Sequence, residues 1–472
     1  MLTVHRRNIM ITEGPIGKNM LQFFFPILLG TFFQQLYNTA DAIIVGNYVG
    51  QEALAAVGGA SGNLINLILG FFMGMSGGAT VIVAQYYGAR NIEGVSHTVH
   101  TGMATCLTVG LILTCVGFLI TPTALGWMNT PADVMPMAKT YMRIFFLGTV
   151  ANMIYNIGSG ILRAIGDSRR PLYFLICSCL ANIVLDLLFV TVFRLGVLGV
   201  ALATIISQTI SATLVILVLV RSHDCYHLSI REIRFHRETF RRIIQIGLPA
   251  GLQSMMYNIS NTLIQAAINS FGSQTMAAWT AFGKIDGIFW MVANAFGITN
   301  STFCGQNFGA RKYGRMRACV QTGFLMSASG AVVIGALFIL LRRMLLGLFL
   351  VDANTIEIGV SIMMAEVPFY LAWVPIEIIS GTCRSAGEAV RPMLITACGI
   401  CLLRILWLIL VMPKWHEATV LAASYPFTWA MTSIIFFVYY KSMKWLTNHL
   451  PEDIRPEEAL RQYRSGGIGR SA

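Results

Sequence analysis

The chain has 472 residues, of which 56% are hydrophobic and only 11% are charged. A soluble domain carries about 25% charged residues, so this composition excludes an ordinary soluble protein and indicates an integral membrane protein. The formal net charge of +12 would suit nucleic-acid binding in a soluble chain, but here the basic residues stand between apolar segments. The positive-inside rule accounts for that distribution better, and we expect membrane lipid, not nucleic acid, around the protein.

Residues 1–19 are basic and polar, and the apolar run that follows is too long for a signal-peptide core, so we expect no cleaved signal. Twelve apolar segments are then long enough to cross a bilayer as helices. They lie near residues 20–46, 54–87, 99–120, 138–162, 171–193, 197–220, 243–270, 276–303, 318–341, 358–383, 392–412 and 418–440. At this hydropathy only helices are plausible in lipid, so we expect an all-α membrane fold.

Lysine and arginine are distributed unevenly between the two sets of loops. One set, which includes both termini, holds 25 of the 33 basic residues, and the opposite set holds six. This predicts that both termini are cytoplasmic in a multi-pass protein of the cell (inner) membrane. We divide the chain into an amino-terminal six-helix lobe, a cytoplasmic linker, a carboxy-terminal six-helix lobe and a polar, loosely ordered cytoplasmic tail, at 1–220, 221–242, 243–441 and 442–472.

The second half repeats the first. The tripeptide Gly-Ala-Arg at 88–90 returns at 309–311, and Gly166-Asp167 returns as Gly387-Glu388, each at an offset of 221, while Pro26 matches Pro249 at an offset of 223. Six helices per half give both halves the same orientation, so a pseudo-two-fold axis should run along the membrane normal. That is the arrangement of a rocking transporter with a cavity between its halves.

Polar residues interrupt four of the first six apolar segments at helical spacing. They are Gln34, Asn38 and Asp41 with Tyr37 beside them, Asn152 and Asn156, Asn182 and Asp186, and Thr204 and Gln208. Residues three, four or seven apart share one helix face. A carboxylate at mid-membrane costs about 2.5 to 3.5 kcal/mol on insertion scales, so we expect these stripes to avoid lipid and to converge on one polar interior.

Two carboxylates in such an interior allow two mechanisms. With amide and hydroxyl oxygens they can coordinate Na⁺, a hard cation. Alternatively they share a proton, because two close carboxylates repel each other when both are charged. Either way the site exchanges a cation. The simpler alternative, hydrogen bonding between helices, suits the Asn, Gln and Thr residues better than it suits Asp41 and Asp186.

The second half lacks this acidic cluster. Ile264 corresponds to Asp41 at an offset of 223, and Leu403, Trp407 and Tyr425 correspond to Asn182, Asp186 and Thr204 at an offset of 221. It has its own buried charges instead: we expect Glu377 and Arg404 to pair, and Lys284 and Asp286 to form a local pair. Trp290, Trp373 and Trp407 either pack or stack on an aromatic cation.

Two further features bear on mechanism. Pro26 lies on the helix that carries Asp41, where it removes a backbone hydrogen bond and allows a kink, and a bend there that alters the cavity is a hypothesis. Signals for enzymes fail: Cys398 and Cys401 form a CxxC with no second pair, and no phosphate-binding Gly-x-x-x-x-Gly-Lys loop is present. We therefore expect no enzymatic activity, no cofactor and no direct use of ATP.

These motifs resemble those of the multidrug and toxic compound extrusion (MATE) family, over nearly the whole chain, and most of all its DinF-type prokaryotic branch. The resemblance rests on Tyr-Asn-x-x-Asp at 37–41, Gln-x-x-Gly-Ala-Arg at 85–90 and 306–311, and Arg-Ala-x-Gly-Asp-x-x-x-Pro at 163–171. It implies a cation site at Asp41, Asn182, Asp186 and Thr204, and a lobe cavity that includes Tyr37, Asn152 and Asn156. Gln253 stands where the NorM-type branch has an acid, which argues against a second cation site.

The resemblance implies export of cationic amphiphilic compounds, driven by influx of Na⁺ or H⁺, and we expect a monomer. An alternative is a flippase for lipid-linked precursors or polysaccharides from the related superfamily, whose members have extra helices and a strongly basic cavity. A channel is the third alternative, but no selectivity-filter pattern supports it. The natural substrate, the coupling ion and its stoichiometry stay open at this point.

Overall fold

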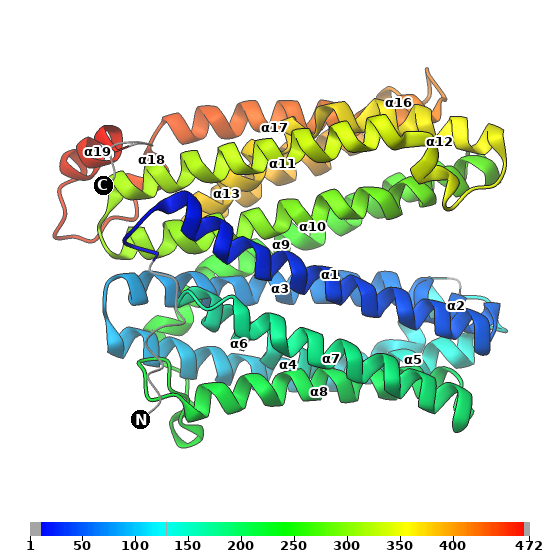
Figure 1. Cartoon of the computed structure of the whole chain (residues 1–472), viewed down its shortest axis with the longest axis horizontal. Helices are drawn as coiled ribbons and strands as arrows, with labels where there is room; N and C mark the ends of the chain where they lie inside the picture. Colours follow the sequence, from blue (N-terminus) through cyan, green and yellow to red (C-terminus); the bar gives the residue numbers. More distant parts are fainter. Residues whose placement is uncertain (1–10, 129, 467–472) are drawn as a thin grey trace. The chain divides into compact units, whose positions relative to one another are not determined.

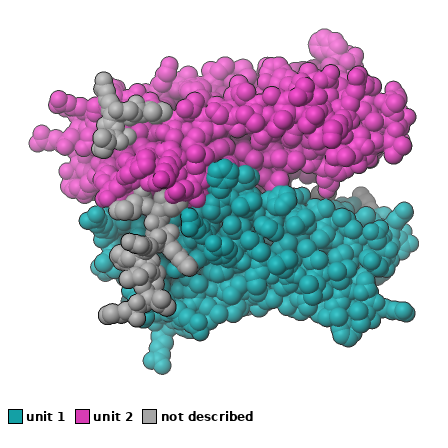
Figure 2. All heavy atoms as spheres, in the orientation of Figure 1, with its two compact units in different colours: residues 1–9, 25–251 teal, residues 10–24, 252–472 magenta. Residues whose placement is uncertain are grey.

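The computed structural model describes residues 11–128 and 130–466, and it contains helices and no strand in those ranges. They form two compact units, which Figure 2 colours separately. The first unit consists of Phe25–Gly251, and the second combines residues 11–24 with the chain from Leu252 onward. The prediction of an all-α membrane protein is confirmed.

The helices up to the linker follow one another with short connections (Figure 1). They are α1 (Ile16–Tyr48), α2 (Gln51–Gly58), α3 (Ala60–Gly88), α4 (Ile92–Trp127), α5 (Met135–Leu147), α6 (Thr149–Ala164), α7 (Arg169–Leu187) with a π-helical end η2 (Leu188–Val192), α8 (Val197–Arg221) and the short η3 (Ile230–Glu232).

The helices after the linker repeat this pattern with more interruptions. They are α9 (Arg237–Asn269), α10 (Ser273–Gly309), α11 (Tyr313–Gly347), α12 (Ala353–Glu366), η4 (Val367–Ala372), α13 (Val374–Ser385), α14 (Val390–Thr396), the π-helical η5 (Ala397–Leu402), α15 (Leu403–Leu410), α16 (Ala418–Ala422), α17 (Ser424–Lys441), α18 (Lys444–Thr447) and α19 (Pro456–Ser465).

Nine described helices are long and apolar enough to cross a membrane, and the α5–α6 pair, bent by 47°, makes ten. Helices α9 and α10 have 33 and 37 residues, which is long enough to span at 1.5 Å per residue, but they are more polar. Each of the twelve predicted segments coincides with one of these helices or bent series. Polar residues inside α9 and α10 lower their mean hydropathy, which explains why these two helices are not among the ten.

The chain passes from one unit to the other inside a helix and not in a loop. The boundary falls between Phe24 and Phe25 in α1, and between Gly251 and Leu252 in α9. Each point lies within two residues of a proline inside the helix, Pro26 in α1 and Pro249 in α9. The linker predicted at 221–242 covers the connection after α8 and the first residues of α9, and the predicted division into lobes, linker and tail stays a prediction.

The start of α9 packs on α3 through glycines in both helices. A Cβ added at Gly74 would lie 2.6 Å from the backbone of Ala250 and Gly251, and one at Gly78 would lie 2.7 Å from the nitrogen of Gly247. Such distances leave no room for any side chain, so the glycines permit backbone contact between helices. The Gln85 amide oxygen, on the same end of α3, accepts a hydrogen bond of 3.0 Å from Arg242.

The repeated Gly-Asp/Glu-x-x-Arg-Pro motif caps a helix in each unit. Asp167 accepts hydrogen bonds of 3.1 Å from the backbone N–H groups of Arg169 and Arg170 at the start of α7. Glu388 accepts one of 3.2 Å from Arg391 at the start of α14, and each acid also pairs with its arginine. A carboxylate at a helix N-terminus satisfies free N–H groups and complements the helix dipole.

The tail prediction is wrong for the described residues up to 466. Helix α19 packs on α11, where Tyr463 and Ala459 are buried, and Trp445 of α18 is fully buried as well. His449 contacts Glu388 at 3.3 Å, so the tail also joins the α13–α14 turn. A few apolar and aromatic anchors at helical spacing are enough to order a segment whose overall composition is polar.

We expect the substitution Glu388→Gln to destabilise the protein at neutral pH but not at acidic pH. Burial raises the pKa of Glu388, but hydrogen bonds from His449 and the Arg391 N–H, with the charges of both residues, outweigh burial and hold the pKa below its usual value. A lowered folded-state pKa stabilises above the unfolded value of about 4.3 and ceases to do so as pH falls through the folded value.

The variant should lose up to ~1 kcal/mol of unfolding free energy at neutral pH, the upper end for a pair with an exposed partner. The difference from wild type should shrink below about pH 4, as measured by thermal unfolding in detergent across a pH series. Glu452→Gln, at an exposed position between α18 and α19, is the control and should change little. A deficit of the same size at every pH would contradict the assignment.

Candidate functional site

Four of the residues predicted to hold a cation lie together inside the first unit. Asp41 comes from α1, Asn182 and Asp186 come from α7, and Thr204 comes from α8, and between 0% and 6% of each is exposed. The Asp41 carboxylate is within interaction range of the other three side chains. We call these four residues the acidic cluster.

Local packing explains why these helices meet. Ser178 Oγ of α7 donates a hydrogen bond of 2.8 Å to the Ser207 carbonyl of α8, and the two helices lie side by side (Figure 1). On α1, Gly30 leaves space for Leu175 of α7, since a Cβ there would lie 3.1 Å from the leucine Cδ1. The α-helix gives way to the π-helix η2 two residues after Asp186, and π-helical turns occur frequently at functional sites.

Several polar atoms of the acidic cluster make no hydrogen bond within the described part of the chain. They are Asp41 Oδ1, both carboxylate oxygens of Asp186, and both the amide oxygen and nitrogen of Asn182. Thr204 Oγ1 donates its proton to the Val200 carbonyl at 2.9 Å, which leaves the oxygen lone pairs free. Buried polar groups without partners are costly, so this oxygen set suits a bound cation or shared protons.

The donor set also limits the kind of cation. Within the described ranges, no group of three or more His, Cys, Asp or Glu side chains is arranged to hold a metal ion. The acidic cluster has two carboxylates, and amide and hydroxyl oxygens complete it. Oxygen ligands without imidazole or thiolate suit a hard cation and not a transition metal.

Aromatic and amide side chains border the acidic cluster. Tyr37 interacts with the side chain of Gln208 and with the charges of Asp41 and Asp186, and the place of Tyr37 and Gln208 in a substrate cavity stays a prediction. Tyr141 of α5 is also buried and interacts electrostatically with Tyr37 and both aspartates. Sequence reasoning missed Tyr141, because a single tyrosine in an amphipathic segment gives no signal of its own.

The remaining predicted residues lie apart from the acidic cluster. Asn38 is exposed and Gln34 is half-buried. Asn156 donates hydrogen bonds of 2.8 and 2.9 Å to the side-chain and backbone oxygens of Asn152, and the pair borders a small hollow against Leu69, Phe72, Met73 and Ser76 of α3. The α6 pair therefore faces α3, and the convergence of all four stripes on one interior stays a prediction.

In the second unit, the expected Glu377–Arg404 pair is also wrong. Arg404 donates a hydrogen bond of 2.9 Å to Asn261, lies 3.9 Å over the centre of the Tyr425 ring, and interacts with the charge of Glu366. Glu377 interacts instead with Arg384, which donates a hydrogen bond of 3.1 Å to Gln253. Charges on segments that all cross the same slab cannot be paired from sequence alone.

Nor does Asp286 pair with Lys284, which is exposed. Asp286 accepts hydrogen bonds of 2.5 Å from Tyr370 Oη and Trp290 Nε1. Trp290 makes an edge contact with Trp373 at 4.8 Å between ring centres, and both rings contact Trp429. Trp407 lies elsewhere, and its Nε1 donates a hydrogen bond of 3.1 Å to the Val420 carbonyl. The third tryptophan of this aromatic group is therefore Trp429 and not Trp407.

The two units differ in a systematic way at corresponding positions. At the offsets of the repeat, Asn261 corresponds to Asn38 and Tyr425 to Thr204. Arg404 lies between these two residues in the second unit. In the second unit, the counterpart of Thr204, one residue of the acidic cluster, is therefore an aromatic ring that contacts a guanidinium group supplied by the chain itself.

Comparison with known proteins agrees with this architecture. The family model MatE matches residues 26–188 and 249–410. The probable multidrug resistance protein YpnP of Bacillus subtilis is 27% identical over 92% of this chain and 97% of its own. The probable multidrug resistance protein NorM of Thermotoga maritima is 23% identical over 91% and 93%.

Among solved structures, an outward-facing multidrug resistance MATE transporter of the MOP superfamily shares the fold. Its TM-score is 0.86 at 21% identity, covering 92% of this chain and 97% of that one. Because the family model matches most of the chain, in both units, the chain belongs to the MatE family, whose members are multidrug efflux transporters and not enzymes.

Proposed function

We propose that the protein is a secondary active antiporter that exports organic cations and amphiphilic drugs in exchange for Na⁺ or H⁺. The coupling ion binds at the acidic cluster. The observation that carries this proposal is a buried pair of carboxylates, Asp41 and Asp186, in which Asp41 Oδ1 and both Asp186 oxygens have no hydrogen-bond partner in the described structure. Two adjacent buried anions are stable only with a positive charge between them or a shared proton.

Exchange follows from competition for this negative charge. An ion that enters the acidic cluster neutralises the attraction that holds an organic cation in the lobe cavity, so the drug is released. The protein, which has released the drug and still holds the ion, then changes conformation and delivers the ion to the cytoplasm. A ligand shifts such an equilibrium only by its difference in affinity for the two states, and the unpartnered oxygens provide that difference.

The drug would bind beside the acidic cluster. We assign Gln34, Tyr37, Asn38, Asn152, Asn156 and Gln208 to the lobe cavity, with amide and phenol groups to orient a ligand and the aspartates to attract its charge. The names of the curated relatives, which are multidrug resistance proteins, support this substrate class. From the distribution of its basic residues, we place the protein in the cell (inner) membrane with both termini in the cytoplasm. We also propose that it is a monomer.

Arg404 makes the two lobes unequal in this mechanism. Its guanidinium is always protonated and cannot leave, and its charge interacts with the buried Glu366. The coupling ion that we propose for the first lobe is, in contrast, exchangeable. This supports one coupling site per protein and agrees with Gln253, an uncharged residue held between Arg384 and Thr396.

Pro26 offers a place for the conformational change to begin. It lies inside α1, fifteen residues before Asp41 on the same helix, and directly after the point where the two units meet along that helix. The missing N–H weakens the helix there. Bending at Pro26 would move Asp41 relative to α7 and so alter the acidic cluster.

The first prediction concerns the two carboxylates. Asp41→Asn and Asp186→Asn should each reduce drug efflux more than about tenfold, because a hydrogen bond or ligand contact to a charged group is worth about 1.5 to 3 kcal/mol. Ethidium transport in proteoliposomes with imposed gradients measures this. Asp133→Asn, at a loop carboxylate before α5, is the control. Wild-type efflux by the Asp41 variant would refute the role.

Separate gradients identify the ion. In vesicles with a Na⁺ gradient at equal pH, or a pH gradient without Na⁺, the protein should respond to one ion, and that response should vanish in the Asp41→Asn variant. If transport occurs but depends on neither gradient, that result would contradict antiport and favour the flippase alternative.

The second prediction concerns Arg404. Arg404→Leu should cost about 1.5 to 3 kcal/mol of stability, because it removes the charged hydrogen bond to Asn261, and the double variant with Glu366→Gln should recover the part of that loss that comes from the attraction between the two charges. Thermal unfolding measures the cycle. Arg343→Leu, which removes an exposed pair with Glu357, should change little. An Arg404 loss that Glu366→Gln fails to recover would contradict the pairing.

The third prediction concerns Pro26. In a variant without native cysteines, a cross-linker between Leu21→Cys and Leu28→Cys would hold α1 straight across the proline, and transport should stop. The same cross-link between Leu111→Cys and Phe118→Cys, at exposed positions on α4 with no proline between them, should leave transport intact. Full activity of the α1-linked protein would exclude bending there.

A further inference from the structure

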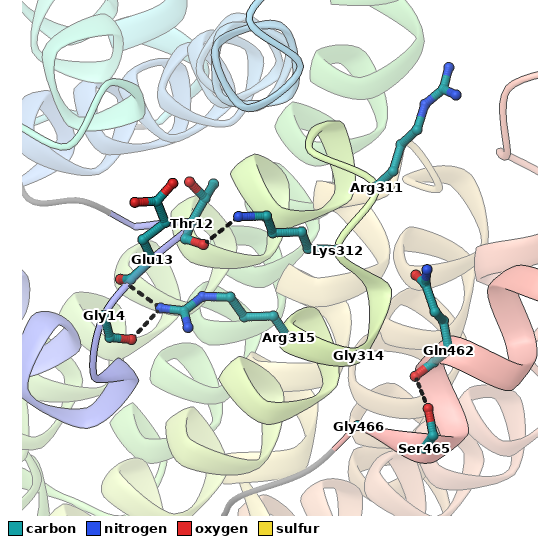
Figure 3. A pocket seen from close by; sticks show the side chains of 10 residues that line it. All are labelled: Thr12, Glu13, Gly14, Arg311, Lys312, Gly314, Arg315, Gln462, Ser465 and Gly466. Atoms are coloured by element: carbon teal, nitrogen blue, oxygen red, sulfur yellow. Dashed lines mark hydrogen bonds between the residues drawn. The ribbon is translucent and has the colours of Figure 1, made fainter. Parts of the chain in front are cut away.

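The second unit contains a hollow of about 600 Å³ outside the site described above. Figure 3 shows that three separate parts of the chain line it: Thr12–Gly14 before α1, the turn between α10 and α11, and the end of α19. All three parts belong to the second unit. The end of α19 approaches the turn at backbone distance, since a Cβ added at Gly314 would lie 3.0 Å from the Gln462 carbonyl oxygen.

Positive side chains dominate this hollow. Arg311, Lys312 and Arg315 line it, against the single carboxylate of Glu13. Arg311 is neutralised by Asp453, at 2.7 Å. Lys312 Nζ instead donates to the Thr12 carbonyl at 3.0 Å.

Arg315 likewise has only neutral acceptors: it donates to the Glu13 and Gly14 carbonyls at 2.8 and 2.7 Å. Carbonyl oxygens satisfy N–H donors but carry no net charge. Among the described residues, no acid forms an ion pair with Lys312 or Arg315, so their charges remain available to an anion.

The first half contains the same turn with the opposite chemistry. Arg90 and Arg311 occupy matching positions and adopt the same left-handed backbone, with φ of 55° and 59°. After Arg90, Asn91 caps α4 by accepting from the Gly94 N–H at 2.9 Å, and Glu93 lies in the first turn. After Arg311, the cap position holds Lys312, no side chain caps α11, and no acid lies in its first turn.

This comparison shows what the second turn lacks. The chain itself supplies acceptors for the free N–H groups of α4, whereas at α11 it has replaced them with two cations. The start of a 35-residue helix and two positive side chains all favour the same occupant, a negatively charged group. The candidate span Tyr313–Gly347 begins at this turn, so the turn lies at one end of a helix long enough to cross a bilayer.

We propose that this hollow binds a phosphate-bearing anion through Lys312, Arg315 and the free N–H groups of α11. Arginine and lysine are the usual partners of phosphate in proteins. The anion is the headgroup of an anionic phospholipid or a free phosphate. By neutralising the turn it would also fasten residues 12–14 and the end of α19 to α11. The proposal does not depend on the antiport mechanism.

The test measures thermal unfolding of the full-length protein in two media. In detergent, inorganic phosphate is titrated against sodium chloride of equal ionic strength. In nanodiscs, phosphatidylcholine is partly replaced by phosphatidylglycerol. Binding to the folded state raises the unfolding temperature in a saturable way, so the wild type should be stabilised by at least one of these two anions. Stabilisation only in nanodiscs identifies a lipid headgroup, and stabilisation by phosphate alone shows that the free anion is sufficient.

Variants separate the site from a general salt effect. Lys312→Gln should weaken the apparent affinity about tenfold, the size expected for losing one charged contact. Lys312→Asn should do the same and should also raise the unfolding temperature without anion, because it restores the cap that Asn91 provides in α4. Arg90→Gln removes one charge from the corresponding turn and should respond to anions like wild type.

Two results would overturn the proposal. One is a wild-type protein whose unfolding temperature does not respond to either anion. The other is an equal response in wild type and both Lys312 variants, which would assign the effect to exclusion of phosphate from the protein surface in general. If Lys312→Gln proves too unstable to purify, Lys312→Asn still shows whether anion binding needs Lys312. In that variant the added helix cap compensates for the stability lost with the contact to Thr12.

Discussion

Two negative charges buried side by side are the constraint on which the rest of the first unit depends. Asp41 and Asp186 come from helices that are about 145 residues apart in sequence yet lie within interaction range. At most 6% of either residue is exposed. Such a pair is unfavourable by itself when both carboxylates are charged, so a cation or a proton would stabilise it. Under the proposed mechanism, the packing of α1, α7 and α8 holds this pair for the coupling ion.

The same physical problem has a different solution in the second unit. There the buried acid Glu366 has a partner built into the chain, since the Arg404 guanidinium supplies the positive charge and Asn261 and Tyr425 hold it in place. The repeat gives two lobes with the same helices, and under the proposed mechanism the mobile ion binds in the first lobe. An asymmetry of this kind would let one lobe respond to an ion gradient while the other remains unchanged.

A parallel contrast occurs at the turns after the Gly-Ala-Arg motif. At the start of α4, Asn91 caps the helix and the acid Glu93 lies in the first turn. The start of α11 has Lys312 and Arg315 instead, with no side-chain cap and no acid in its first turn. In both comparisons the backbone of the repeat is retained and the charge is not. Repeated folds thus allow a chain to specialise by moving single charges, since the helices that carry them are stabilised by apolar packing elsewhere.

The sequence by itself determined the features that depend on local composition and spacing. Hydropathy located the spanning segments, the offsets of 221 and 223 revealed the repeat, and helical spacing placed Asn182 and Asp186 on one face. It also singled out Asp41, because one carboxylate in an apolar helix is costly wherever the helix packs.

Only the tertiary structure decided which charges meet. Periodicity defines the face of a helix but not the neighbour that it faces, so Arg404 was assigned to Glu377 although it interacts with Glu366, and the hollow that the α6 asparagines form against α3 was not foreseen. The unit boundaries inside α1 and α9 were likewise hidden, because a helix that passes from one packed body to another has the same local pattern throughout. Long-range pairing is a property of packing, and no local pattern encodes it.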